Sequence, residues 1–130
     1  MLALAFEDRY RVLLVRFSGI HVPEDISELE WAATEIVAWD GPMHGLLLDY
    51  TSVEAVAVPH SFIAYRARLP QISSGYERVM VAPNPELYEL AHAYARLQRD
   101  FGNHEPRVVL SLWDAYQLLG LDKPDFQDIR

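Results

Sequence analysis

A group of polar side chains follows an apolar segment near the middle of the sequence. The segment is Gly45-Leu46-Leu47-Leu48, and the polar residues after it include Asp49, Thr51, Ser52, His60 and Ser61. A carboxylate, hydroxyls and an imidazole are the groups that enzymes use for proton transfer and nucleophilic attack. In open α/β sheets, ligands and partners are met outside the carboxyl ends of the strands. The spacing therefore places a candidate site at residues 49–61.

The spacing of these residues does not favour catalysis. Adjacent residues on a helix point about 100° apart, so His60 is badly placed to take a proton from Ser61. The nucleophile-elbow pattern G-x-S-x-G is also absent from the sequence. Asp49 and Glu54 could act as an acid–base pair, but an acid at a strand end more often accepts hydrogen bonds from loop amides. We therefore predict no catalytic residue and a protein that is not an enzyme.

Metal ions and nucleotide cofactors are not expected either. No two of the five histidines share an i, i+4 face or an H-x-H spacing. The six glycines are isolated, and none begins a dinucleotide-binding or P-loop pattern. The chain has no cysteine, which excludes thiolate ligands and disulfides. We predict no metal site and no cofactor.

The charge of the chain limits its partners. With 19 acids and 11 bases, the formal net charge is −8, and Lys123 is the single lysine. Phosphate backbones and anionic membrane surfaces are bound by clustered basic residues, so nucleic acid and membranes are not expected partners. No apolar run approaches the roughly 20 residues of a membrane helix, and the first residues do not form a signal sequence. A cytoplasmic protein is expected.

Apolar periodicity and local end signals divide the chain into alternating strands and helices. Pro23 suits the first turn of the first helix, while Ser27 and Glu30 offer a capping box slightly further in. Asn84 and Ser111 are placed to cap the last two helices, and Gly120 ends the last one. The expected strands are 2–6, 10–17, 45–50, 78–82 and 107–110, and the expected helices are 23–39, 59–69, 85–101 and 112–119.

This order predicts an α/β fold with one domain. Repeated strand–helix–strand units give right-handed crossovers and a mostly parallel sheet. We expect a five-stranded sheet with about four helices and an N-terminal strand that runs antiparallel to its hairpin partner. The domain is expected to span residues 1–121, and residues 122–130 to form a polar C-terminal tail.

The run Gly45-Leu46-Leu47-Leu48-Asp49-Tyr50-Thr51-Ser52-Val53, then a helix, then Arg78-Val79-Met80-Val81-Ala82 and a long helix, resembles STAS domains. These are anti-sigma-factor antagonist-like modules, and the STAS/SEC14-like single-domain proteins of bacteria are more similar still. The resemblance covers residues 8–120 and implies a regulatory or interaction domain without enzymatic activity. Some members carry a phosphorylatable Ser or Thr at the start of the second helix. Here the matching segment is Ala57-Val58-Pro59, without a hydroxyl, and the nearest hydroxyls are those of Ser61, Thr51 and Ser52.

Two functional hypotheses follow for the segment 49–61. In the first, Asp49 holds the loop, and an exposed apolar run of Val53, Ala55, Val56 and Val58 contacts a protein partner that is a regulatory or sensor protein. In the alternative, a small apolar ligand binds in a pocket between the sheet and the second helix. The candidate binding residues are Asp49, Thr51, Ser52, Val56, Val58, His60 and Ser61. A homodimer formed through an edge strand or the exposed face of Trp31 is left open.

Overall fold

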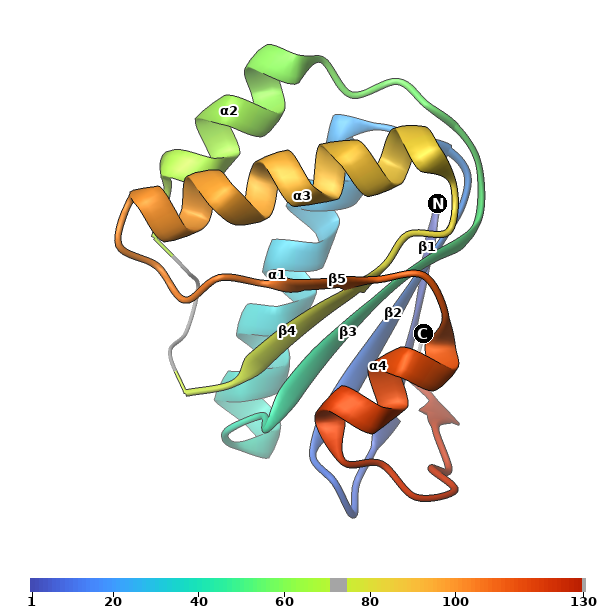
Figure 1. The fold of residues 1–130 in the computed structure, drawn as a ribbon. Helices are drawn as coiled ribbons and strands as arrows, with labels where there is room; N and C mark the ends of the chain where they lie inside the picture. The colour runs from blue at the N-terminus through green and yellow to red at the C-terminus, as the bar shows by residue number, and fades with distance from the viewer. Residues whose placement is uncertain (71–74, 130) are drawn as a thin grey trace.

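The computed structural model describes residues 1–70 and 75–129, except for the side chains of residues 39 and 40. It has one sheet with helices on both faces (Figure 1). The strands are β1 (Leu2–Glu7), β2 (Val12–His21), β3 (Gly45–Val56), β4 (Glu77–Val81), β5 (Arg107–Val109) and β6 (Gln127–Asp128). The helices are α1 (Pro23–Asp40), α2 (His60–Arg68), α3 (Pro85–Asp100) and α4 (Leu112–Leu119).

The sheet is mixed, with the order β5-β4-β3-β2-β1-β6. β2, β3, β4 and β5 are parallel, and β1 is antiparallel to β2. The α/β class, the mostly parallel sheet, the antiparallel first strand and the four helices are therefore confirmed. The number of strands is six instead of five, because β6 pairs with β1 at Ala5 and Phe6.

The C-terminal segment explains the additional strand. Residues 122–130 were expected to form a polar tail, but part of this segment lies along β1. Glu7 accepts backbone hydrogen bonds from Arg9 at 2.9 Å and from Asp125, and the backbone N–H of Ile129 donates to Leu4 O at 3.0 Å. These contacts are made by backbone groups and one carboxylate, so apolar periodicity gives no sign of them.

The central strands are longer than expected. β3 was predicted to end at Tyr50 but continues to Val56, because β2 also continues and pairs with it up to His21. The pairing is irregular between Arg16 and Ser18 and again at Gly19. Asp49 therefore lies within β3 and not at its end. Thr51 and Ser52, which indicated a loop, belong to the exposed part of β3.

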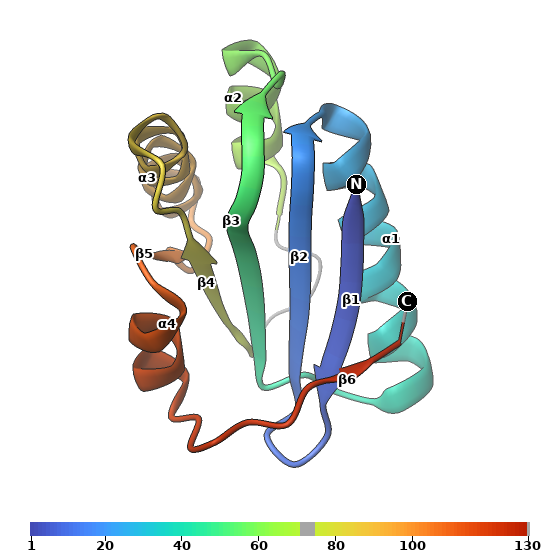
Figure 2. The ribbon, with the colours of Figure 1, turned by 90° about the vertical axis from the view of Figure 1, so that its right-hand side faces the viewer.

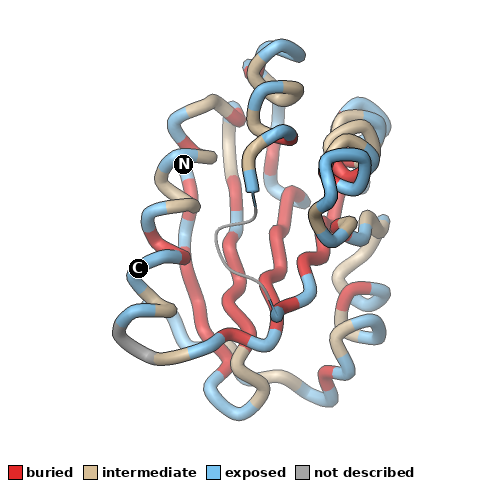
Figure 3. The backbone as a smooth tube through the Cα atoms, turned by 90° about the vertical axis from the view of Figure 1, so that its left-hand side faces the viewer, coloured by how far each residue is buried: buried red, intermediate tan, exposed pale blue. Residues whose placement is uncertain are grey.

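Each face of the sheet has its own apolar core. Side chains of β1 to β4 pack with α1 and α3 on one face, around residues such as Phe17 and Leu48. On the other face, α4 covers a smaller core around Leu14 and Leu47. Figure 2 looks at the sheet with α1 and α2 behind the strands, and Figure 3 shows that the buried residues follow the strands. Successive side chains of a strand point to opposite faces of the sheet. Alternate residues of β3 therefore face the helices α1 to α3.

The helix ends follow local signals. α1 starts at Pro23, as the first-turn signal predicted, and Asp25 accepts a hydrogen bond from the Val22 backbone at 3.1 Å. Asn84 caps α3 by accepting from Glu86 N at 2.8 Å, and Ser111 caps α4. Both predicted caps are confirmed. In the described part of the chain, no helix is long and apolar enough to cross a membrane.

Candidate functional site

Asp49 is a buried, structural acid in this fold. The residue is 3% exposed, and its side chain lies on the same side of β3 as Leu47, away from α1 to α3. Its Oδ1 accepts a hydrogen bond from Thr51 N at 2.9 Å, and its Oδ2 lies 3.5 Å from Arg16 Nε. Both contacts are made where the pairing of β2 and β3 is irregular. Asp49 therefore stabilises the irregular part of β3.

The expected exposed apolar run is wrong in most of its members. Val53 and Val58 are buried and Val56 is half-buried, which leaves Ala55 as the exposed member. The irregular pairing turns Val53 toward the face that α1 and α3 cover, where it joins the larger core. Val56 and Val58 line a pocket on that same face. These valines therefore do not form the exposed apolar surface that was expected.

The hydroxyls and the imidazole of the predicted site are exposed. Thr51 and Ser52 lie on the exposed part of β3, and His60 and Ser61 begin α2. No side chain caps the start of this helix. The structure thus separates the predicted residues into three groups: the buried Asp49, an exposed polar group, and the two valines Val56 and Val58, which line a pocket.

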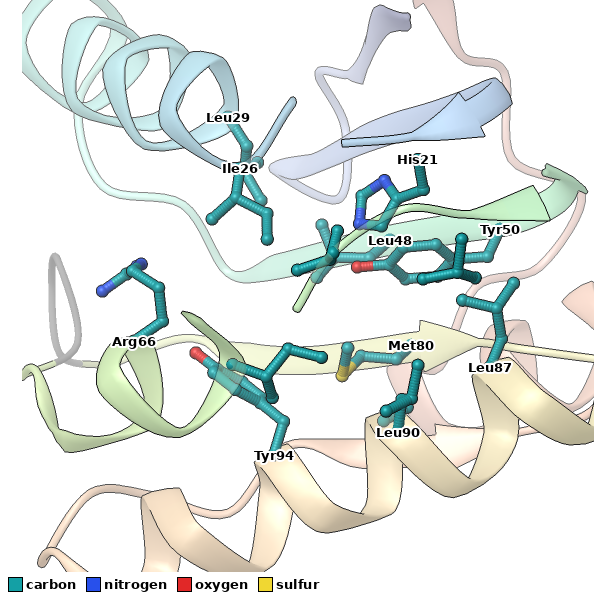
Figure 4. A pocket seen from close by; sticks show the side chains of 14 residues that line it. His21, Ile26, Leu29, Leu48, Tyr50, Arg66, Met80, Leu87, Leu90 and Tyr94 are labelled. Carbon is teal, nitrogen blue, oxygen red and sulfur yellow. The ribbon is translucent and has the colours of Figure 1, made fainter. Parts of the chain in front are cut away.

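The pocket lies between the sheet and the helices α1, α2 and α3, where the alternative hypothesis placed it. Its volume is about 100 Å³. In Figure 4, Ile26 and Leu29 extend into it from α1, Leu87 and Leu90 from α3, and the ring of Tyr50 from β3. The lining is mostly aliphatic, as expected for a site that buries an apolar ligand. Its lining residues are His21, Ile26, Leu29, Leu48, Tyr50, Val56, Val58, Ile63, Arg66, Met80, Leu87, Leu90, Ala91 and Tyr94.

One wall of the pocket is a cluster of aromatic rings. Tyr50 stacks on Phe17 with ring centroids 4.7 Å apart, and His21 meets both rings edge on. Burial lowers the pKa of His21, although Asp25, with Oδ2 3.4 Å from His21 Nδ1, opposes this. Burial also raises the pKa of Tyr50. Both side chains are therefore uncharged at neutral pH, and this wall offers hydrogen bonding without charge.

A second cavity of about 50 Å³ adjoins the pocket. The two share the residues Leu29, Leu48, Arg66, Met80 and Tyr94. The smaller cavity is also lined by Arg78 of β4 and Gln98 of α3, which are both buried. Gln98 accepts from Arg78 Nη1 at 2.9 Å and donates to the backbone oxygens of Ala67 and Leu69. This network joins β4, α3 and the end of α2 at one end of the cavity.

The two cavities contain residues that the sequence-based prediction missed. Arg78, His21 and Tyr50 were assigned to strands or loops without a role. The signal available for Arg78 was its position as a charged residue at the start of the otherwise apolar run 78–82. Arginine is rarely buried, so an arginine in an apolar strand is unusual. His21 and Tyr50 had no such signal, since they come together through the extended pairing of β2 and β3.

Comparisons with known proteins address the fold. No protein-family model matches the sequence, and no curated protein matches it. The architecture is that of a STAS-like domain, as the resemblance predicted. Among solved structures, it is similar to the anti-sigma factor antagonist SpoIIAA in its unphosphorylated form, with a TM-score of 0.57 and 11% sequence identity. The alignment covers 93% of this chain and 100% of that one.

Proposed function

We propose that this protein is a non-catalytic regulatory domain of the STAS type that acts by binding another protein in the cytoplasm. The observation that carries the proposal is the similarity of the fold to an anti-sigma factor antagonist over 93% of the chain. The described residues also contain no group of three His, Cys, Asp or Glu side chains that could hold a metal ion. The net charge of −8 favours a protein partner over nucleic acid or an anionic membrane.

The proposed contact surface is the exposed part of the predicted site. It comprises Thr51, Ser52 and Ala55 on β3 and His60 and Ser61 at the start of α2. Ser61 is the hydroxyl best placed for phosphorylation, because the helix dipole stabilises a phosphate at a helix N-terminus. Phosphorylation of this serine would change the charge of the surface and so control partner binding.

Capture of partners from the source cells tests this proposal. Tagged protein is incubated with lysate, and captured proteins are quantified by mass spectrometry and then tested as purified components. Ala55→Asp places a charge in the proposed surface and should abolish capture, whereas Ala38→Asp on the exposed side of α1 should not. Val56 is not a suitable probe, because it lines the pocket. Equal capture by both variants would contradict the proposed surface.

A second candidate function is the binding of a small apolar ligand. The observation that favours it is the apolar pocket between the sheet, α1, α2 and α3. Its volume of about 100 Å³ is of the order of an engineered cavity of about 150 Å³ that binds benzene. Native mass spectrometry of the purified protein tests it, and a bound small molecule in successive preparations is expected. A mass without ligand in every preparation, and no binding of added apolar compounds, would exclude it.

A further inference from the structure

We propose that the ligand of this pocket carries a carboxylate, and that Arg78 binds it. The apolar part of the ligand would lie in the larger cavity, and the carboxylate in the smaller one. This inference rests on the second candidate function, the binding of a small apolar ligand, and adds the chemical class of that ligand.

Arg78 carries a buried positive charge. The residue is 6% exposed, and its guanidinium donates to Gln98 Oε1 at 2.9 Å, to the Tyr94 hydroxyl at 3.4 Å and to His104 O at 2.6 Å. All of these acceptors are neutral, and none of the described carboxylates forms an ion pair with Arg78. A buried charge is costly unless an opposite charge compensates it. An anionic ligand would supply this compensation.

Arg78 also has a hydrogen-bond donor without a partner among the described residues. Arg78 Nε is buried and has no hydrogen-bond partner among the described residues, while Arg78 lines the smaller cavity. Buried donors are nearly always paired, and an unpaired one needs an explanation. A guanidinium N–H forms its strongest hydrogen bonds with a carboxylate. The unpaired Nε thus indicates where a carboxylate oxygen would bind.

The charged side chains around the two cavities do not balance. Arg66 borders the larger and the smaller cavity, and its Nε lies 2.7 Å from Glu30 Oε1. Two guanidinium groups and one carboxylate leave one positive charge here, although the whole chain carries a net charge of −8. One carboxylate on a ligand would neutralise this end of the pocket. A ligand with an ammonium group would be repelled.

The volumes limit the size of the ligand. Cavities of about 100 and 50 Å³ are smaller than the roughly 300 to 1,000 Å³ of pockets for drug-sized ligands. The apolar part should therefore be no larger than benzene, which binds in a cavity of about 150 Å³. A short-chain or aromatic carboxylic acid has this size. Hexanoate is a suitable probe.

The test compares three six-carbon ligands that carry different charges at the head group. Hexanoate, hexan-1-ol and hexylamine are titrated into the wild-type protein, and binding is followed by calorimetry and by the NMR signal of the Arg78 Nε–H. We expect hexanoate to bind at least tenfold more tightly than the other two and to shift the Arg78 signal. This comparison requires no variant, so it does not depend on how a substitution affects folding.

A pair of variants then assigns the preference to one arginine. Arg78→Met keeps an unbranched side chain but removes the charge, and should bring hexanoate down to the affinity of hexan-1-ol. Arg96→Met removes an exposed arginine from α3 and should keep the tenfold preference. A preference retained in folded Arg78→Met would overturn the role of Arg78.

The outcomes separate this inference from the function on which it rests. If hexanoate and hexan-1-ol bind equally, the pocket binds apolar ligands but the carboxylate proposal is wrong. If neither binds, both the carboxylate proposal and the apolar-ligand function are wrong. Tighter binding of hexylamine than of hexanoate would also overturn the proposal, because an ammonium group would bind tightly only beside a negative charge of the protein.

Discussion

Arg66 of α2 and Glu30 of α1 form an ion pair across the pocket, with Arg66 Nε 2.7 Å from Glu30 Oε1. The side chain of Arg66 is 14% exposed and that of Glu30 is 35% exposed. α2 otherwise packs against α3, where Ala67 is its buried residue. The ion pair therefore joins α2 to α1 at a point where both residues border the smaller cavity.

Breaking this ion pair should loosen α2 with little loss of global stability. Partly exposed ion pairs contribute at most about 1 kcal/mol, so Glu30→Gln should lower the free energy of unfolding by no more than that. Amide hydrogen exchange in α2 should become faster, because the helix loses its contact with α1. Glu105→Gln, which removes the exposed partner of Arg99, is the matched control. Unchanged exchange in α2 would show that the ion pair does not hold the helix.

Gln98 should contribute strongly to stability. Its side chain is 1% exposed and bonds Arg78, Ala67 O and Leu69 O. Gln98→Leu would leave buried groups without partners, at a cost of about 1 to 3 kcal/mol each. We expect thermal unfolding to begin at a clearly lower temperature, with Tm reduced by several degrees. Gln117→Leu, on the exposed side of α4, should leave Tm nearly unchanged, and equal losses in the two variants would contradict this prediction.

His21 should make stability depend on pH. Burial lowers the pKa of His21 in the folded protein, so the folded state binds this proton less readily than the unfolded chain does. The contribution is fully present above the unfolded pKa of about 6.5 and is lost as pH falls below it. The Tm should therefore decrease between about pH 7 and pH 5. In His21→Gln this decrease should be smaller.

His44→Gln is the control for this measurement, because His44 is exposed at the start of β3. Its pH profile should match that of the wild-type protein. Glu7 affects stability at lower pH than His21 does, because the backbone hydrogen bond from Asp125 lowers the pKa of the Glu7 carboxyl from 4.5. Its contribution is lost on acidification below that value. An identical slope in wild-type and His21→Gln between pH 7 and pH 5 would show that His21 is not the group responsible.

Asp49 should behave as a structural residue in folding experiments. Asp49→Ala removes the acceptor for Thr51 N and the ion pair with Arg16, and should cost about 1 to 3 kcal/mol in the free energy of unfolding. Asp49→Asn keeps an acceptor oxygen and should cost less than half as much. Urea unfolding measures both, with Glu54→Ala as the control at an exposed position of the same strand. A larger effect of Asp49→Asn than of Asp49→Ala would exclude this explanation.

Local signals predicted more of this fold than long-range contacts did. The caps at Asn84 and Ser111 could be predicted, because the capping side chain and its backbone partner lie within three residues. The extension of β3 to Val56 could not, since it depends on pairing with β2 across α1. The same holds for β6, whose two residues pair with β1 at the other end of the chain.

The candidate site shows the same limit. The sequence correctly predicted a pocket beside the second helix, because its position follows from the element order. It did not separate the buried Val53 and Val58 from the exposed Ala55, because an irregular pairing shifts the alternation within β3. The neighbours of Arg78 could not be predicted either. Tyr94 and Gln98 are 16 and 20 residues away and meet it through the packing of α3 on β4.

The short strands at the two sides of the sheet affect how copies of this chain can associate. β5 has three residues and β6 has two, and both lie at the outer positions of the strand order. An outer strand can pair with another chain through its free N–H and C=O groups, and a short one provides few of them. Two copies would therefore gain little from joining their sheets into a continuous one. Contacts between copies through side chains such as the exposed Trp31 and Trp113 would not have this limit.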